Sequence, residues 1–160
     1  MEVALFEPRI PQNTGNIARS CAAFNLPLNL IEPLGFKIED KYLRRAGLDY
    51  WPLVTVNKYE NFNKFLASKT TKRIISFSKK NGMYLKDFKF QENDVLLFGR
   101  EDLGLPNSII EKSDYLISIF MPNLQTSKND QKGVRSLNLS VACGIAIYEA
   151  HKQINFQNGN

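Results

Sequence analysis

Residues 96–106 read "LLFGREDLGLP" and join an apparent buried strand to a glycine-rich, charged loop. The apolar run ends at Phe98, and Gly99 and Gly104 then enclose three charged residues and a leucine. Glycine lets the backbone turn where a Cβ would clash, and it lets a ligand come close. A strand that ends in such a loop is therefore a candidate ligand site.

The rest of the chain repeats this alternation of short apolar strands and helical segments. The strands are β-branched and aromatic and are bounded by Pro, Gly, Asn or Asp, whereas the segment 14–25 carries apolar residues at i, i+4 and i+7. The segment 59–68 is also amphipathic, and 138–152 is apolar on nearly every face. Strands are predicted at 3–6, 28–31, 53–56, 73–77, 94–98 and 115–120, and helices at 14–25, 59–68, 106–113 and 138–152. This order predicts an α/β fold, with a mostly parallel sheet flanked by helices on both faces.

Length and composition predict one domain over residues 1–152 and a disordered tail at 153–160. No apolar run is long enough to cross a membrane, and the first residues, "MEVALFEP", are too acidic for a signal peptide. Cys21 and Cys143 lie in apolar stretches, which is typical of reduced core cysteines. We therefore expect a cytoplasmic protein without a membrane partner.

The formal net charge of +5 is unevenly distributed. Residues 64–89 contain eight Lys or Arg and a single acidic residue, Asp87. Such a segment, flanked by aromatic side chains, suits a phosphate backbone. The alternative is a solvated, lysine-rich face with no ligand.

Four loops with unusual chemistry follow predicted strands, at 7–19, 78–82, 99–104 and 121–140. In parallel sheets, ligands bind at the carboxyl ends of the strands. The loop 99–104 is not a Walker loop, because Leu105 and Pro106 replace Lys and Ser/Thr. One histidine, His151, makes a metal site or a Ser–His–Asp triad improbable. A ligand held by backbone groups, such as an adenosine-containing cofactor beside a nucleic acid, fits best.

Three motifs resemble the signatures of the SPOUT superfamily of RNA methyltransferases: "EPRIPQNTGNIARSCAAF" (7–24), "LFGREDLGLP" (97–106) and "RSLNLSVACGIAIYE" (135–149). With "IEPLGF" (31–36) and "KYLRRAGLDYW" (41–51), the chain resembles the TrmL type, which methylates the 2′-hydroxyl of the wobble cytidine or uridine of tRNA. The resemblance implies a C-terminal trefoil knot, an exception to unknotted topology. It also implies S-adenosylmethionine as cofactor, no metal, a homodimer, and the tRNA anticodon stem-loop as partner.

The resemblance also implies site residues. The loop 99–104 would wrap the cofactor, with Gly99 letting the backbone approach it. The residues expected to bind the cofactor are Phe77, Ser78, Gly99, Glu101, Gly104, Ile119, Phe120, Ser136 and Leu137.

The residues expected to act in catalysis are Arg19, Asn13, Ser136, Asn138 and Glu101. Arg19 is a poor base because its pKa exceeds 12, so it is expected to pair with a phosphate and orient the ribose. Each residue also has a structural alternative. Arg19 can be a surface arginine, Asn13, Ser136 and Asn138 can cap helices, and Glu101 can be a solvated loop charge.

RNA contacts are expected from cations, which meet phosphates, and from aromatic rings, which stack on unpaired bases. The residues concerned are the cations Lys41, Arg44, Arg45, Lys79 and Lys80 and the aromatic Tyr50, and the family's first motif adds Asn16. Ordinary core aromatics on a helix are the alternative for the stretch 41–51. Two alternatives to wobble methylation also stay open: methylation at another tRNA or rRNA site, and a non-catalytic RNA-binding relative.

Overall fold

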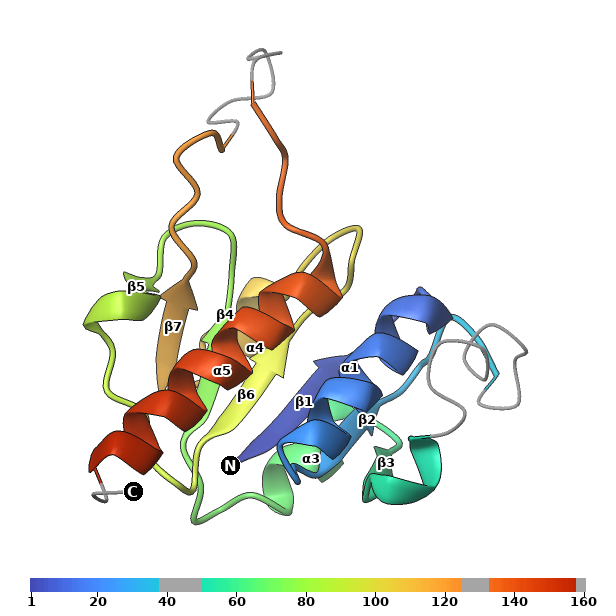
Figure 1. The fold of residues 1–160 in the computed structure, drawn as a ribbon. Helices are drawn as coiled ribbons and strands as arrows, with labels where there is room; N and C mark the ends of the chain where they lie inside the picture. Colours follow the sequence, from blue (N-terminus) through green and yellow to red (C-terminus); the bar gives the residue numbers. More distant parts are fainter. Residues whose placement is uncertain (38–49, 125–132, 158–160) are drawn as a thin grey trace.

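A parallel seven-stranded sheet forms the centre of the protein (Figure 1). The computed structural model describes residues 1–37, 50–124 and 133–157. The strand order is β3-β2-β1-β6-β4-β7-β5, and every neighbouring pair is parallel. The strands are β1 (Glu2–Phe6), β2 (Leu28–Ile31), β3 (Val56–Tyr59), β4 (Ile74–Phe77), β5 (Met83–Tyr84), β6 (Val95–Phe98) and β7 (Tyr115–Ser118).

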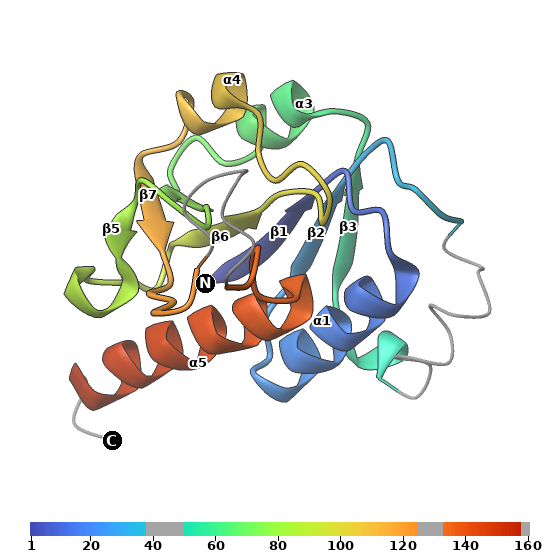
Figure 2. The same ribbon diagram turned by 90° about the horizontal axis from the view of Figure 1, so that it is seen from above.

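Helices cover both faces of this sheet (Figure 2). The long helices α1 (Pro11–Ala23) and α5 (Leu139–Gln157) pack side by side on one face. The short helices α3 (Phe62–Ala67) and α4 (Asn107–Ile110) lie on the other. The predicted α/β architecture is confirmed. The knot stays a prediction from the resemblance.

Two hydrophobic clusters, one on each face, hold the layers together. Along β1, Val3 and Leu5 join the cluster under α1 and α5, whereas Ala4 and Phe6 join the cluster under α3 and α4. This alternation follows from the two-residue period of a strand. Because both faces are covered, β1, β2, β4 and β6 are buried throughout, and their residues are apolar except for Glu2, Asn29 and Ser76.

The two cysteines belong to the cluster between the long helices and the sheet. Cys21 on α1 and Cys143 on α5 are fully buried and unpaired, which confirms that both are reduced core residues. Burial raises the pKa of the Cys21 thiol to about 12. Both side chains therefore act as small apolar groups in the helix packing.

Element boundaries differ from the predicted ones for local reasons. The predicted strand at 53–56 is a 3-10 turn at Trp51–Leu53 followed by β3, because Pro52 stands at the start of the turn. The first helix begins at Pro11, three residues earlier than predicted, since proline is well suited to a first helical position. At the other end, α5 continues to Gln157, through residues assigned to the tail.

The chain leaves β1 in one direction toward β2 and β3, and the remaining strands extend the sheet on the other side of β1. This reversal lies between β1 and β6, and a crevice forms at the carboxyl ends of the strands beside such a point. The segments after β1, β4, β6 and β7 therefore meet at one edge. Within the described residues, no helix has the length and hydropathy needed to span a bilayer.

Candidate functional site

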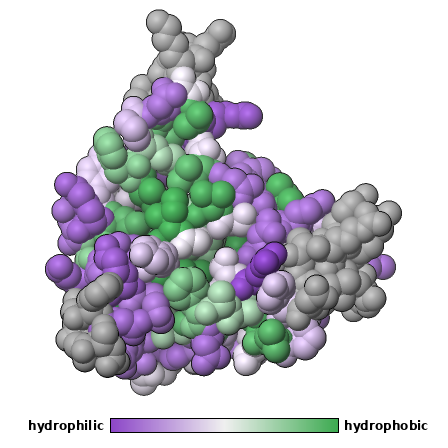
Figure 3. All heavy atoms as spheres, in the orientation of Figure 1, coloured by the Kyte–Doolittle hydropathy of each residue, from purple (hydrophilic) through white to green (hydrophobic). Residues whose placement is uncertain are grey.

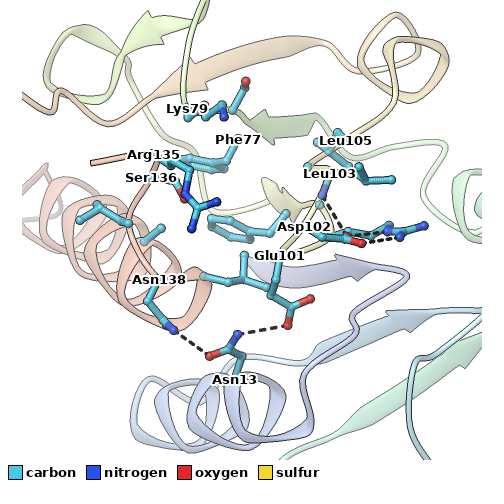
Figure 4. A pocket seen from close by; sticks show the side chains of 18 of the residues that line it. Asn13, Phe77, Lys79, Glu101, Asp102, Leu103, Leu105, Arg135, Ser136 and Asn138 are labelled. Carbon is cyan, nitrogen blue, oxygen red and sulfur yellow. Dashed lines mark hydrogen bonds and ion pairs between the residues drawn. The ribbon is translucent and has the colours of Figure 1, made fainter. Parts of the chain in front are cut away.

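A cavity of about 670 Å³ lies at this edge of the sheet (Figure 4). Its walls come from the segments that follow β4, β6 and β7, and from the start of α5. The lining residues are Ile10, Asn13, Phe77 to Lys79, Phe98 to Leu105, Ile119, Met121, Arg135 to Leu139 and Ala142. Its volume and its mixture of aromatic, aliphatic and polar walls are typical of a cofactor site.

Most residues predicted to bind the cofactor line this cavity. They are Phe77, Ser78, Gly99, Glu101, Gly104, Ile119, Ser136 and Leu137. Phe120 is placed elsewhere: its side chain is 63% exposed and its ring meets the edge of Tyr84 in a second hollow beside α5. The side chain of Phe120 therefore points away from the other predicted residues.

Both glycines of the loop 99–104 are required by the loop's own backbone. Arg100 and Gly104 exchange two main-chain hydrogen bonds, of 3.2 and 2.8 Å, which fold the loop back on itself. A Cβ on Gly99 would lie 2.3 Å from the carbonyl carbon of Gly104, and Gly104 itself has a φ of +71°. Gly99 thus serves loop closure, in addition to the expected approach of a cofactor.

Two of the loop's charges pair with each other. The Arg100 guanidinium donates to both carboxylate oxygens of Asp102, at 2.9 and 2.7 Å, and lies 3.5 Å from Glu7. The hydrogen bonds from Arg100 lower the pKa of Asp102 to about 2. Asp102 is therefore ionised and already compensated at neutral pH.

The third charge, Glu101, binds the beginning of α1. Its carboxylate accepts hydrogen bonds from the backbone N–H groups of Arg9 (2.8 Å) and Ile10 (3.1 Å), and from the Asn13 side-chain amide (3.2 Å). The segment before a helix has N–H groups without helical partners, and a carboxylate there is favoured by the helix dipole. Glu101 is thus not a solvated loop charge, because its carboxylate fixes the segment before α1.

Asn13 links three elements (Figure 4). It is 5% exposed, donates to Glu101, and accepts a hydrogen bond of 3.0 Å from the side-chain amide of Asn138. The Asn138 oxygen accepts from the backbone N–H and the hydroxyl of Ser140, so Asn138 caps α5 as one alternative predicted. The motif residues therefore join the starts of α1 and α5 to the loop after β6.

Arg19 lies outside the cavity of its own chain. Arg19 and Asn16 occupy the exposed face of α1, and the guanidinium carbon of Arg19 stands 4.6 Å from the centre of the Tyr50 ring. The ring predicted to stack on RNA is therefore already covered on one face by a cation. This outward direction agrees with the expectation from the family resemblance that Arg19 of one protomer reaches the cofactor site of the other.

Two of the predicted RNA-binding cations lie in the described part of the chain. Lys79 lines the cavity and Lys80 follows it, whereas Lys41, Arg44 and Arg45 lie outside the described residues. The basic segment 64–89 is not a uniform phosphate-binding face. Lys69 and Lys72 bind Glu2, and Arg73 binds Asp94, at the opposite edge of the sheet.

Sequence reasoning missed one cation of the cavity, Arg135. The available signal was its position directly before Ser136 in "RSLNLS". Within the described ranges, no three His, Cys, Asp or Glu side chains gather as a metal ion would require.

The family model of the SpoU rRNA methylases matches residues 1–148. The chain belongs to the SpoU rRNA methylase family. It is 41% identical over 154 residues to a tRNA (cytidine(34)-2′-O)-methyltransferase of Saccharophagus degradans, with 96% of each chain covered. It is 37% identical to the enzyme of that name in Escherichia coli K12, covering 98% of this chain and 95% of the relative.

A solved structure agrees with this membership. The protein described under "Structural insights into the 2-OH methylation of C/U34 on tRNA" superposes with a TM-score of 0.87 at 41% identity. The match covers 99% of this chain and 97% of the other. The cavity and its motif residues thus lie in a fold shared with RNA-modifying enzymes over nearly their whole length.

Proposed function

We propose that this protein transfers a methyl group from S-adenosylmethionine to the ribose 2′-hydroxyl of cytidine or uridine 34 of tRNA. The observation that carries the proposal is near full-length similarity, at 37–41% identity, to enzymes named for that reaction on cytidine. The cavity built from all three sequence motifs supports it. We further propose that residues 1–152 act as one catalytic domain.

The residues of the cavity fit this cofactor. Apolar walls from Phe77, Phe98 and Leu137 suit an adenine ring, and the closed loop 99–104 offers main-chain groups to its polar edge. When bound, S-adenosylmethionine supplies a methyl group on an electrophilic sulfonium. The proposed chemistry assigns no step to a metal ion.

The motif residues position the reaction. Glu101, Asn13 and Asn138 hold the starts of α1 and α5 beside the cavity, and Ser136 lines it. Arg19 pairs with the phosphate beside the target ribose and orients the 2′-hydroxyl for in-line attack. Lys79 and Lys80 contribute contacts to the tRNA backbone.

The direction of Arg19 supports a homodimer. Because Arg19 faces away from the cavity of its own chain, we propose that it acts at the cavity of a second copy.

An exposed apolar patch on α5 also supports a dimer. It is formed by Val141 (50% exposed), Ile145 (38%) and Tyr148 (61%), and hydrophobic side chains gather on this face of the molecule (Figure 3). A patch of this kind is typical of a protein interface.

The substitution Arg19→Ala tests the function and the role together. We expect methyl transfer to tRNA to fall by at least about 100-fold, because an oriented charge contact at a reacting group contributes roughly 3 kcal/mol. The calorimetric Kd for S-adenosylmethionine should stay unchanged, since Arg19 does not line the cavity. Mapping of ribose methylation in the product locates the modified nucleotide.

Lys64→Ala, an exposed cation on α3, is the matched control and should retain activity. Methylation at a nucleotide other than 34 would contradict the proposed substrate. Loss of cofactor binding in a folded Arg19→Ala protein would contradict the proposed role of Arg19.

A further inference from the structure

The charges that line the cavity do not balance. Its two carboxylates are occupied, since Asp102 binds Arg100 and Glu101 accepts three N–H groups. Its remaining cations are Lys79 and Arg135. Among the described residues, neither Lys79 nor Arg135 forms an ion pair. The wall therefore carries a surplus of positive charge.

Arg135 is held at this wall by its neighbours in the chain. On one side, Val134 forms a bridge with Leu124, and its N–H donates to the Asn123 carbonyl at 2.8 Å. On the other side, Asn138 caps α5 and binds Asn13. Only three residues separate these two anchors, so the backbone of Arg135 has a defined place although its side chain is exposed.

The side chain points into the cavity (Figure 4). A guanidinium presents a planar set of donors that matches a carboxylate or a phosphate with two parallel hydrogen bonds. Cations that line a concave wall without a carboxylate partner raise the local potential and attract an anion. These properties distinguish Arg135 from Arg100, whose donors are already directed to Asp102.

We infer that Arg135 is the anion-binding residue of the cavity and takes a carboxylate or phosphate group of a ligand bound there. The inference rests on the proposed function, which supplies two ligands that carry a carboxylate or phosphate group. One is the α-carboxylate of the cofactor's methionine half, and the other is a phosphodiester of the tRNA next to the target nucleotide. Lys79 adds to the potential at the same wall.

The test compares Arg135→Gln, which removes the charge, with Arg135→Lys, which keeps it, and with the distant control Lys64→Gln. If the cofactor carboxylate is the ligand, Arg135→Gln weakens S-adenosylmethionine binding by about tenfold in calorimetry. Binding of decarboxylated S-adenosylmethionine then changes little between the two proteins. Arg135→Lys should restore part of the affinity.

If the tRNA phosphate is the ligand, cofactor binding stays unchanged and tRNA binding weakens by about tenfold. The slope of log K against log salt then falls by about 0.7 to 0.9, the value for one phosphate. Lys64→Gln should show neither effect in this assay or in calorimetry.

A third experiment tests the anion site independently of the proposed methyl transfer. Inorganic phosphate, titrated against labelled protein by NMR, should shift the amides of Gly99 and Leu137 saturably in the wild type and not in Arg135→Gln. This result would support the anion site even if the protein failed to methylate tRNA. Equal binding of cofactor, tRNA and phosphate by the wild type and Arg135→Gln would overturn the inference while leaving the methyltransferase intact.

Discussion

The stacked pair of Arg19 and Tyr50 gives the proposed catalytic arginine a fixed direction. An exposed arginine loses roughly 2 kcal/mol of side-chain entropy when it is immobilised. The contact with the Tyr50 ring already restricts the Arg19 side chain in the free protein, so less entropy is lost when RNA binds. Tyr50 is itself held by the turn that Trp51 anchors in the core. We therefore interpret Tyr50 as a positioning residue for Arg19.

Replacing Tyr50 separates this interpretation from direct stacking on RNA. Tyr50→Leu removes the aromatic face and should lower kcat by about five- to tenfold, since a cation–π contact at an exposed site is worth roughly 1 kcal/mol. Tyr50→Phe keeps the face and should retain wild-type kcat. Steady-state kinetics with tRNA measures both, and calorimetry should show equal cofactor affinity.

A different pattern would contradict the positioning role. If Tyr50→Leu raised KM for tRNA and left kcat unchanged, the ring would act by contacting RNA. If Tyr50→Phe were as impaired as Tyr50→Leu, the hydroxyl group rather than the aromatic face would matter.

The loop after β6 and the helix α1 form one unit through Glu101. The loop closes on itself through Gly99 and Gly104, and this closure directs Glu101 to the backbone before α1. Asn13 extends the unit to α5. The starts of two helices and one strand end are thus placed relative to one another by a few hydrogen bonds.

The substitution Glu101→Gln tests this connection between elements. An amide keeps one accepting oxygen but loses the other, so at least one N–H of this segment is left without its acceptor. We expect the free energy of unfolding to fall by about 1–2 kcal/mol. Chemical denaturation measures the change. Cofactor affinity should fall in parallel because the same residue lines the cavity.

The exposed neighbour Asp102 offers a control in the same loop. Asp102→Asn affects a pair near the surface and should move the melting temperature far less than Glu101→Gln does. Equal shifts for the two variants would show that Glu101 acts as an ordinary loop charge.

At the scale of the whole molecule, the two edges of the sheet use cations differently. At the amino edge, Lys69 and Lys72 bind the buried carboxylate of Glu2. At the carboxyl edge, Lys79 and Arg135 face a cavity. The first group stabilises the fold, and the second is available to ligands.

Stability should depend on Glu2 in a defined pH range. Burial alone would raise the pKa of Glu2, but hydrogen bonds from Lys69, Lys72 and Asn29 outweigh it and lower the pKa from 4.5 to about 2. The native state therefore favours the ionised form. This contribution is complete above about pH 4.5 and is lost as the pH falls toward 2.

Glu2→Gln should remove that pH dependence and destabilise the protein by roughly 3 kcal/mol at neutral pH, because it leaves Lys69 buried without a carboxylate. Unfolding experiments between pH 2 and 7 measure both effects. Asp87→Asn, which affects the exposed pair with Lys86, should cost less than about 1 kcal/mol. A Glu2→Gln protein as stable as the wild type would show that the buried pair contributes nothing.

The apolar patch on α5 predicts the assembly. Light scattering at micromolar concentration should give twice the 18.3 kDa mass of the chain. Ile145→Glu places a charge in the patch at a half-exposed position and should yield a folded monomer without methyl transfer, whereas Lys64→Glu should remain dimeric. A fully active 18.3 kDa monomer would contradict both the dimer and the reach of Arg19 into a second cavity.

Local patterns in the sequence were sufficient for the α/β class, for most strands, and for the loops that form the cavity. Strand periodicity and glycine-containing turns depend on neighbours in the chain, so they can be read without a structure. The boundary errors arose where a proline or a cap shifted an element, as at Pro11 and Pro52. The eight cavity-lining residues that are expected to bind the cofactor came from the family resemblance, because local patterns indicated only which loops could hold a ligand.

The sequence motifs indicated most of the residues that line the cavity, and the tertiary structure decided what each of them contacts. Glu101 meets a backbone 92 residues away, Asn13 meets Asn138 across 125 residues, and Glu2 neutralises Lys69 across 67. The outward direction of Phe120 was likewise decided by the tertiary structure. Contacts of this range depend on how parallel strands are ordered in the sheet, and no local pattern of side chains encodes that order.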